Sequence, residues 1–409
     1  MRFVEVVKEM EIQMHKIKQK FDSGYLEDIE GTVKQEISKL NLQIKKGQRI
    51  AITAGSRGID RIPSILRAVA AKVKEMGGEP FLIPAMGSHG GATAEGQKKI
   101  LEELGITPEF VGAPVLSSME IVKVGTFSPP VSADCRPVEI AVVMDKNAYE
   151  ADGIIVVNRV KPHTSFHSDV ESGMMKMIAV GMGKKVQAEN IHSFGTKGLR
   201  EYIVPIARKV IETGKIIAGI GIVENSYDRV LEIRAFLPED IEQGEKDLLQ
   251  KARKSMPGLP VDQLDMLIVE KLGKNISGTG MDTNIIGRLK IHGEPETGKP
   301  TIGRIIVLDL TPETKGNAYG IGLADFTTKA LVEKIDYKAT YTNAITSTFT
   351  ERVKIPVIAE NEQEAFEMAV KACGIKDLDT IRAIRIKNTL ELEEIWVSPA
   401  IYGELQAKI

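Results

Sequence analysis

Histidines placed directly after strand-like runs are the strongest chemical signal in this sequence. The chain has six histidines, and four of them gather in three short segments. His89 lies in GSHGGAT, His163 and His167 lie in KPHTSFH, and His192 lies in ENIHSFG. Because imidazole titrates near neutral pH and also binds metal ions, such residues can act as acids, bases or ligands. A single histidine in a glycine-rich loop can instead cap a turn, so the grouping favours a site more than any one residue does.

Arg57 and Lys176 add a guanidinium and an amine to this set. Arg57 lies in TAGSRGID, between a strand-like run and a helix-like run, where it can clamp a carboxylate or a phosphate. Lys176 lies in SGMMKMIAVGMGKK, among methionines and an isoleucine. One interpretation is a buried helix whose lysine extends outward to solvent. The other is a partly buried amine with a lowered pKa, suited to covalent attachment.

Common nucleotide and hydrolase motifs do not account for these residues. The sequence contains neither G-x-S-x-G nor H-E-x-x-H. Its G-x-G pairs lack the third glycine of a dinucleotide-binding fingerprint. Examples are Gly181/Gly183, Gly219/Gly221 and Gly278/Gly280.

The elements that must position the site follow an alternating pattern in the first part of the chain. Residues 61–76 carry apolar side chains at helical spacing and end at Gly77-Gly78, which predicts an amphipathic helix. Alternating strands and helices are typical of a mostly parallel sheet, and α/β proteins bind ligands at the carboxyl ends of such strands. The expected strands are 49–54, 80–85, 140–145 and 152–160, then a pair at 216–223 and 229–236, and the other expected helices are 94–104 and 239–255.

The same rhythm restarts after a segment that contains two prolines and a glycine, MPGLPVDQ at 256–263. We therefore expect two α/β domains, residues 1–256 and 257–409, with mainly parallel sheets and the active site in the cleft between them. In the second domain, strands are expected at 265–271, 303–309, 354–359 and 381–387, and helices near 326–334 and 361–372.

Composition excludes several classes of partner. With 54 basic and 56 acidic residues the net charge is −2, so no basic field is present to attract nucleic acid. No run of about 18 apolar residues predicts a membrane span. Only two cysteines occur, too few for a disulfide scaffold or a four-cysteine zinc site. A reducing, cytoplasmic location is the default expectation.

Taken in order, these segments resemble the nickel-dependent lactate racemase family. The resemblance covers most of the chain and is densest from residue 50 to residue 195. It implies a two-domain α/β enzyme that carries a nickel-pincer nucleotide (nickel pyridinium-3,5-bisthiocarboxylic acid mononucleotide) on a lysine. The matching segments are those of Arg57, GSHGGAT, KPH, SGMMK, the downstream His192, and MDTNIIGRLK at 281–290.

The resemblance also implies a role for each matched residue. His89 and His163 are expected to be the opposing catalytic acid/bases, and Lys176 is expected to bear the cofactor. His192 is expected to coordinate nickel. Arg57, together with Lys290 in the second domain, is expected to hold the substrate carboxylate.

The implied reaction is racemisation or epimerisation of a small 2-hydroxy acid. Removing the C2 proton would create a carbanion beside an existing carboxylate, and hydride transfer to a cofactor avoids this. Two histidines would serve the two orientations of the substrate. A bound hydride acceptor also fits a chain without a dinucleotide fingerprint. The implied partners are the 2-hydroxy acid and, transiently, the proteins that make the cofactor, with neither nucleic acid nor membrane.

Two departures from the family pattern keep alternatives open. His167 falls inside a lengthened interval between His163 and Lys176, where it could compete as base or ligand. His163 and His167 have H-x3-H spacing, so with His192 they could form the zinc or other divalent-metal site of a hydrolase or lyase. Ile286-Gly287 stand where the family has Tyr-Gln, which supports a third interpretation, a non-catalytic homologue that binds cofactor or ligand.

Overall fold

A computed structural model describes residues 12–130, 138–296 and 298–407. These residues form two compact units. The N-terminal unit is Asp22–Met256, and the C-terminal unit is Pro257 onward together with the described residues before Asp22.

The first strand among the described residues explains why the C-terminal unit is discontinuous in sequence. β1 (His15–Lys18) pairs antiparallel with β14 (Glu394–Val397) at one edge of the sheet of the C-terminal unit. Residues 12–21 therefore pack with the C-terminal unit, whereas the sequence placed them in a first domain of residues 1–256. The division after Met256 lies within the segment 256–263.

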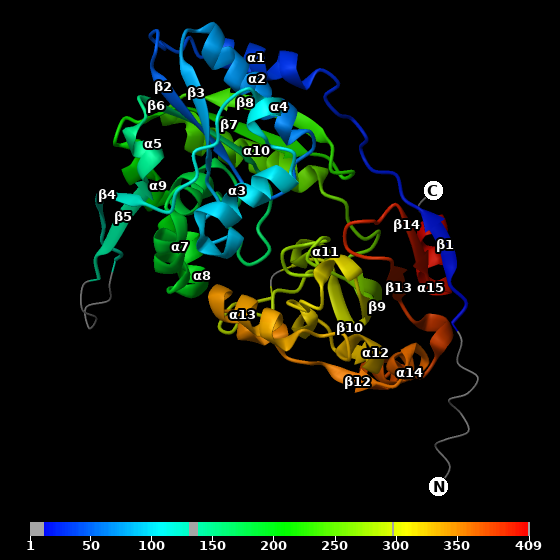
Figure 1. The fold of residues 1–409 in the computed structure, drawn as a ribbon. Helices are drawn as coiled ribbons and strands as arrows, with labels where there is room; N and C mark the ends of the chain where they lie inside the picture. The colour runs from blue at the N-terminus through cyan, green and yellow to red at the C-terminus, as the bar shows by residue number, and fades with distance from the viewer. Residues whose placement is uncertain (1–11, 131–137, 297, 408–409) are drawn as a thin grey trace. The chain divides into compact units, whose positions relative to one another are not determined.

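The N-terminal unit is built on a five-stranded sheet in the order β3-β2-β6-β7-β8. The first four of these strands run parallel, and β8 is antiparallel to β7 (Figure 1). Parallel neighbours place the carboxyl ends of β2, β3, β6 and β7 at one edge of the sheet. The strands are β2 (Arg49–Ala54), β3 (Glu79–Pro84), β6 (Gly153–Arg159), β7 (Ile216–Glu224) and β8 (Val230–Phe236).

One face of this sheet is covered by two amphipathic helices. In α2 (Ile62–Glu75), apolar residues at helical spacing are buried and pack with the α1 residues Val33 and Ile37 in one hydrophobic core. α1 spans Ile29–Lys39 and is capped by the Asp28 side chain, which accepts a hydrogen bond from the backbone N–H of Gly31. The prediction of a helix over 61–76 is confirmed.

The opposite face carries α10 (Ile241–Ser255), which lies against β7. Gly219 and Gly221 allow this approach, because a Cβ on Gly221 would lie 2.4 Å from a methyl carbon of Leu248. The strand pair predicted at 216–223 and 229–236 is confirmed, and so is the helix at 239–255.

The strand predicted at 140–145 forms, but it does not join the parallel sheet. β5 (Ile140–Asp145) pairs antiparallel with β4 (Ile121–Phe127) in a separate two-stranded sheet. The prediction of a buried parallel strand was therefore wrong. β5 is nevertheless almost fully buried, because α7 (Lys184–His192) and α9 (Ile203–Ile211) pack on it, and an apolar run alone does not distinguish this environment. The other helices of this unit are α3 (Ala94–Glu103), α4 (Pro108–Val111), α5 (Lys146–Glu150), α6 (Met174–Lys176) and α8 (Gly195–Lys197).

The C-terminal unit is built on a seven-stranded sheet in the order β1-β14-β13-β9-β10-β11-β12. Strands β13, β9, β10, β11 and β12 run parallel, and β14 and β1 close one edge in antiparallel pairing. The strands are β9 (Gln263–Leu272), β10 (Thr301–Leu310), β11 (Phe326–Thr328), β12 (Val357–Ala359) and β13 (Ala383–Ile386), and the helices are α11 (Thr283–Ile286), α12 (Lys329–Val332), α13 (Tyr337–Ser347), α14 (Glu362–Cys373) and α15 (Pro399–Gln406).

Two elements of this unit differ from the sequence prediction. The helix predicted near 326–334 begins as strand β11 and becomes helical only at Lys329. The strand predicted at 354–359 is shortened to β12, which begins only at Val357. None of the helices in the described ranges has the length and apolar composition that crossing a lipid bilayer requires.

The close contact between α10 and β8 predicts opposite effects for two helix glycines. A Cβ on Gly244 in α10 would lie 2.1 Å from a ring carbon of Phe236, whereas a Cβ on Gly403 in α15 would meet nothing within 4 Å. We expect Gly244→Ala to lower the free energy of unfolding by about 1–3 kcal/mol. Gly403→Ala should raise it by roughly 0.5–1 kcal/mol through helix propensity. Urea denaturation checks both, and a Gly244→Ala variant as stable as Gly403→Ala would contradict the contact.

Candidate functional site

Five of the sequence-predicted residues lie in the N-terminal unit, each on a segment that follows a parallel strand. Arg57 follows β2, His89 follows β3, and His163, Lys176 and His192 follow β6. The positive charge of Arg57 lowers the pKa of Lys176, and the protonated forms of Lys176 and His89 lower the pKa of His192. His163 contacts Lys176 directly. The five residues therefore form one electrostatic cluster, which we call the histidine–lysine cluster.

The shortest contact in the cluster joins the side chains of Lys176 and His163. Lys176 Nζ lies 2.6 Å from His163 Nε2. The other ring nitrogen of His163, Nδ1, accepts a hydrogen bond of 3.0 Å from the backbone N–H of Ser165. An acceptor Nδ1 carries no proton, so a neutral His163 must carry its proton on Nε2. That N–H then donates to Nζ, which requires Lys176 to be an uncharged amine.

Burial favours the same uncharged form of Lys176. The pKa of Lys176 is lowered to about 8, first by burial, second by the positive charge of Arg57, and against the opposing effect of Glu171. Lys176 ends the helical turn α6 and is followed by a π-helical turn, Met177–Gly181. Wide turns of this kind are frequent at functional sites. Of the two sequence interpretations of this segment, the geometry favours the partly buried amine.

Glu171 anchors the loop that carries His163. Its buried carboxylate accepts hydrogen bonds from the backbone N–H groups of His163 at 2.5 Å and Ser168 at 3.0 Å. It also accepts a hydrogen bond of 2.6 Å from Arg253 Nη2. Burial by itself raises the pKa of Glu171, but these hydrogen bonds and one from His167 lower it below the ordinary value. Glu171 is therefore a charged anchor at neutral pH.

The same contacts define where His167 lies. His167 Nδ1 is 3.4 Å from Glu171 Oε1, and its side chain is 40% exposed. Its neighbour is thus the anchor carboxylate, which Arg253 also binds. The arrangement does not favour His167 as a metal ligand beside His163, whose own ring nitrogens face Ser165 and Lys176.

His192 presents a neutral imidazole with an unused nitrogen. It is the last residue of α7, and its pKa is lowered to about 4, first by burial and then by the positive charges that Lys176 and His89 carry when they are protonated. Its buried Nδ1 has no hydrogen-bond partner. A buried polar atom without a partner costs free energy, so a retained one points to a ligand that satisfies it. A neutral imidazole is also the form that binds a metal ion.

His89 is held in the opposite tautomer to His163. Its Nδ1 lies 2.7 Å from the backbone carbonyl oxygen of Met86, so Nδ1 carries the proton and donates it. Nε2 therefore carries the lone pair. Gln97 secures the loop by donating to the carbonyl oxygens of Gly87 at 2.9 Å and His89 at 3.3 Å. His89 is thus arranged as a base, whereas His163 is arranged as an acid.

Arg57 is a cation without an anionic partner. It forms no hydrogen bond or ion pair with any residue that the structure describes. Its pKa is lowered, first by burial and second by the positive charge of Arg159. Arg159 is itself bound to Glu224, so its charge is compensated. Arg57 remains as the cation that an anionic ligand can neutralise.

Two buried carboxylates outside the sequence prediction support this cluster. Glu245 from α10 accepts hydrogen bonds from the first backbone N–H groups of α6, one of them a bond of 2.7 Å from Met175. Asp145 binds the fully buried Lys184 at 2.8 Å. Lys184 also donates to the carbonyl oxygen of Pro84, and so ties the end of β3 to the end of β5. No local sequence signal marks these carboxylates, because their partners lie 70 and 39 residues away.

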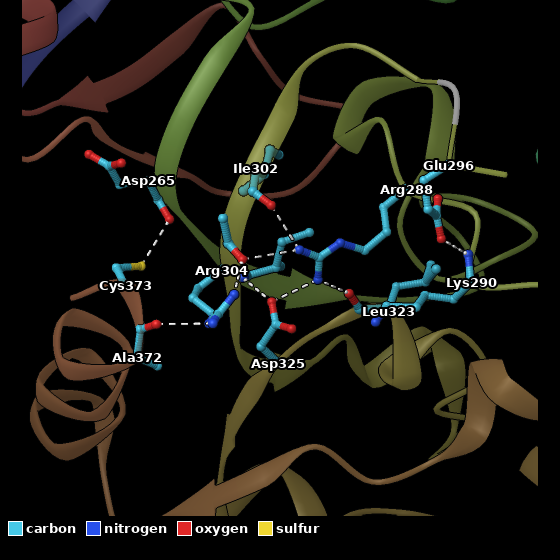
Figure 2. Close-up of polar contacts among 12 residues, drawn as sticks. Asp265, Arg288, Lys290, Glu296, Ile302, Arg304, Leu323, Asp325, Ala372 and Cys373 are labelled. Carbon is cyan, nitrogen blue, oxygen red and sulfur yellow. Dashed lines mark hydrogen bonds and ion pairs between the residues drawn. The ribbon is translucent and has the colours of Figure 1, made fainter. Parts of the chain in front are cut away.

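Lys290 lies in the C-terminal unit, in a loop that Figure 2 shows beside Arg288. Its backbone has a φ of 48° and donates through its N–H to Glu296 Oε1 at 2.7 Å. Arg288 anchors the loop by binding Asp325 at 2.7 Å and the carbonyl oxygen of Leu323 at 2.9 Å. The pairing of Lys290 with Arg57 around one carboxylate stays a prediction.

The same loop explains why Ile286-Gly287 stand where the racemase family has Tyr-Gln. Gly287 has a φ of 62°, and a Cβ there would lie 2.1 Å from the carbonyl oxygen of Pro300. A glutamine cannot occupy position 287 without moving that backbone. Ile286 is apolar and buried in the core of the unit, so it contributes no polar group to a site.

The described residues offer no ready-made site for a metal ion bound by protein alone. Within residues 12–130, 138–296 and 298–407, no group of three or more His, Cys, Asp and Glu side chains could hold one. Structural zinc uses four protein ligands and catalytic zinc usually three. The predicted alternative of a zinc hydrolase or lyase built on His163, His167 and His192 is therefore not favoured.

Comparison with known proteins finds that a family model matches part of the chain, and that this part includes the cluster. The model of a family described as a domain of unknown function, DUF362, matches residues 52–229, which include all five residues of the histidine–lysine cluster. No curated protein matches the chain significantly in sequence.

Two of the solved structures that match have low sequence identity to this chain. The lactate racemase apoprotein of Thermoanaerobacterium thermosaccharolyticum is 15% identical, with a TM-score of 0.51 over 93% of this chain and 99% of that chain. A protein of Thermotoga maritima is also 15% identical, with a TM-score of 0.49 over 68% of this chain and 70% of that chain. The prediction of α/β architecture with mainly parallel sheets is confirmed, and the likeness to the racemase family is distant.

The electrostatic effect of Arg57 on Lys176 predicts a shift in amine reactivity. In the wild-type protein the pKa of Lys176 is about 8. Arg57→Gln removes a positive charge, so the pKa of Lys176 should rise toward its ordinary value of about 10.4. The measurement is the pH dependence of labelling by an amine-specific reagent, mapped by peptide mass spectrometry. Exposed Lys185 serves as the internal reference, and an unchanged Lys176 profile would contradict the interaction.

Burial of Glu245 predicts a characteristic pH dependence of stability. Its pKa is raised to about 7, chiefly by burial. The folded state therefore holds a proton that the unfolded state releases above about pH 4.3, so stability falls as pH rises toward 7. Between pH 4.5 and pH 8 the wild type should lose roughly 2–3 kcal/mol relative to Glu245→Gln.

Glu242 provides the matched control on the same helix. Its pKa is lowered, first by its hydrogen bond with Arg208, so its contribution to stability grows as pH rises. Against wild type, Glu242→Gln should show the opposite slope to Glu245→Gln in urea denaturation at several pH values. Parallel profiles for wild type and Glu245→Gln would refute the assignment.

Proposed function

We propose that this chain is a racemase or epimerase of a 2-hydroxy acid that uses a nickel-pincer nucleotide linked to Lys176. The observation that carries the proposal is the amine of Lys176, whose pKa is lowered to about 8 and which lies 2.6 Å from His163 in a cluster with Arg57 and His192. The distant likeness in fold to a lactate racemase apoprotein supports it.

The residues present fit such a cofactor. Covalent attachment needs a nucleophilic amine, and Lys176 supplies one near neutral pH. Coordination of nickel needs a neutral imidazole, and His192 has a buried Nδ1 without a partner. When bound, the cofactor would supply a hydride acceptor that the side chains of a protein lack.

The protein's own residues would position the substrate and move its protons. Arg57 would bind the substrate carboxylate, with Lys290 of the C-terminal unit as a second proposed contact. His89 would accept the hydroxyl proton of one enantiomer on Nε2. The planar 2-oxo acid would then rotate to present its other face. His163 would return a proton from Nε2 to the carbonyl oxygen of that acid. Exchange of their protonation states would then prepare the reverse direction.

Covalent loading is the direct test of this proposal. Protein co-expressed with the cofactor-making proteins should show one nucleotide-sized mass adduct and about one nickel per chain. Lys176→Ala should abolish the adduct, whereas Lys185→Ala, at an exposed site, should load like wild type. His192→Ala should keep the adduct and lose nickel. Intact mass and elemental analysis measure both quantities.

Activity then separates an enzyme from a binding protein. On loaded protein, chiral chromatography should detect racemisation of a 2-hydroxy acid, and His89→Ala should lower kcat by about 10²-fold or more. Loaded protein without turnover on any hydroxy acid would favour the non-catalytic homologue. Unmodified protein, from cells in which a known racemase loads, would refute the proposed cofactor, and bound zinc would favour the hydrolase or lyase.

A further inference from the structure

We propose that the cofactor-free protein has an activity of its own: Lys176 forms an imine with a 2-oxo acid. The inference uses the same lysine as the proposed function but needs neither nickel nor nucleotide. The geometry points to it because three requirements of imine formation meet in the histidine–lysine cluster. These requirements are an uncharged amine, an adjacent proton donor and a cation for the carboxylate.

The uncharged amine follows from hydrogen bonding. The backbone N–H of Ser165 donates to His163 Nδ1, so the proton of His163 is on Nε2 and points to Lys176 Nζ. A protonated ammonium has no lone pair to accept that bond. No carboxylate among the described residues is in hydrogen-bond contact with Lys176, and the charge of Glu171 offsets only part of the lowering of its pKa. Neutral lysines of this kind act as nucleophiles toward carbonyl carbons.

The adjacent proton donor completes the chemistry with balanced atoms. The Nζ lone pair forms the bond to the carbonyl carbon of the 2-oxo acid, and the carbonyl oxygen takes up a proton to give a carbinolamine. Loss of that oxygen as water leaves the C=N bond, and the two amine protons are released to the water formed. The Nε2–H of His163, which faces Nζ, is placed to protonate the departing oxygen.

The cation determines which carbonyl compounds the site prefers. Arg57 has no partner among the described residues, and its charge acts on Lys176. The other charges nearby are already paired, Arg159 with Glu224 and Glu171 with Arg253. A carboxylate directly attached to the reacting carbonyl would bring its charge to Arg57. A 2-oxo acid therefore fits better than a neutral aldehyde or ketone.

The neighbouring lysines do not share these features. Lys184 is fully buried and paired with Asp145 at 2.8 Å, so its amine is inaccessible. Lys185 is exposed and lies 3.6 Å from Glu189, where solvent keeps its ammonium charged. They provide internal comparisons in one protein.

Reductive trapping tests the inference. Cofactor-free protein, made in a host without the cofactor pathway, is incubated at pH 8 with pyruvate and cyanoborohydride, and the modified lysines are mapped by mass spectrometry. Lys176 should be modified at least about tenfold faster than Lys185, because a much larger fraction of it is uncharged at this pH. Modification should saturate with pyruvate, and Lys176→Arg should eliminate it at this position. A Lys176 rate equal to that of Lys185 would overturn the inference.

Two further variants test the proton donor and the cation separately. His163→Ala should slow trapping by about tenfold or more, because loss of water is no longer assisted. For Arg57→Gln, the measured quantity is the rate of trapping with pyruvate divided by the rate with acetaldehyde. Because both rates depend equally on the pKa of Lys176, the effect of the substitution on that pKa cancels in the ratio. That ratio should fall by about tenfold. An unchanged ratio would refute a carboxylate site at Arg57.

The trapping experiment fails or succeeds independently of the proposed function. Loading with nucleotide and nickel is measured on co-expressed protein, whereas trapping is measured on cofactor-free protein. Protein that loads but does not trap would overturn only the imine inference. Protein that traps but does not load would overturn only the proposed cofactor. If both hold, loaded protein should no longer react with pyruvate, because the amine of Lys176 is already used.

Discussion

A lysine amine that is buried without a carboxylate in contact has a lowered pKa and gives up its proton more readily, and the histidine–lysine cluster is organised around this consequence. Lys176 sits at the end of a helical turn with the imidazole of His163 at 2.6 Å and the positive charge of Arg57 acting on it. An ammonium in this position would be unfavourable through both desolvation and repulsion. The surroundings therefore favour the neutral amine, and the tautomer of His163, which the backbone N–H of Ser165 fixes, turns its Nε2 proton toward that amine. The same positive surroundings, with burial, lower the pKa of His192 and keep that ring neutral as well.

The cluster itself contains no carboxylate. Buried carboxylates on neighbouring segments hold its loops in place. Glu171 fixes the His163 loop through backbone N–H groups, and Glu245 does the same for the first turn of the helix that carries Lys176. Lys184 and Asp145 join the ends of two strands. Buried polar contacts of this kind are costly unless they are complete, so they constrain the loops to one arrangement. Lys176 and Arg57 can remain without ion-pair partners among the described residues because these other residues hold the loops.

In the C-terminal unit, too, side chains hold the backbone of a loop, here on a second, mainly parallel sheet. Arg288 and Glu296 use side chains to hold the backbone around Lys290 (Figure 2). Gly287 is required by a positive φ and by the approach of the Pro300 carbonyl. The Ile286-Gly287 pair is thus part of how this loop folds. A distant likeness in fold to a racemase coexists with this local difference.

The sequence by itself determined the α/β architecture and the segments that carry reactive side chains. Periodicity specified β2, α2, β3 and β6, because a strand buried on both faces and an amphipathic helix each leave a repeating apolar pattern. Residue types specified candidate groups such as Arg57 and His89. These inferences are local, because each depends on neighbours within one turn or one strand.

Only the tertiary structure decided pairing, burial and protonation. β5 joined an antiparallel partner, β1 joined the sheet of the other unit, and His167 turned to Glu171 although its spacing suggested a ligand. The tautomers of His89 and His163 depend on single backbone groups, and the neutral state of Lys176 depends on charges brought from other strands. Desolvation and Coulomb interactions depend on distance in space, which separation along the chain does not encode.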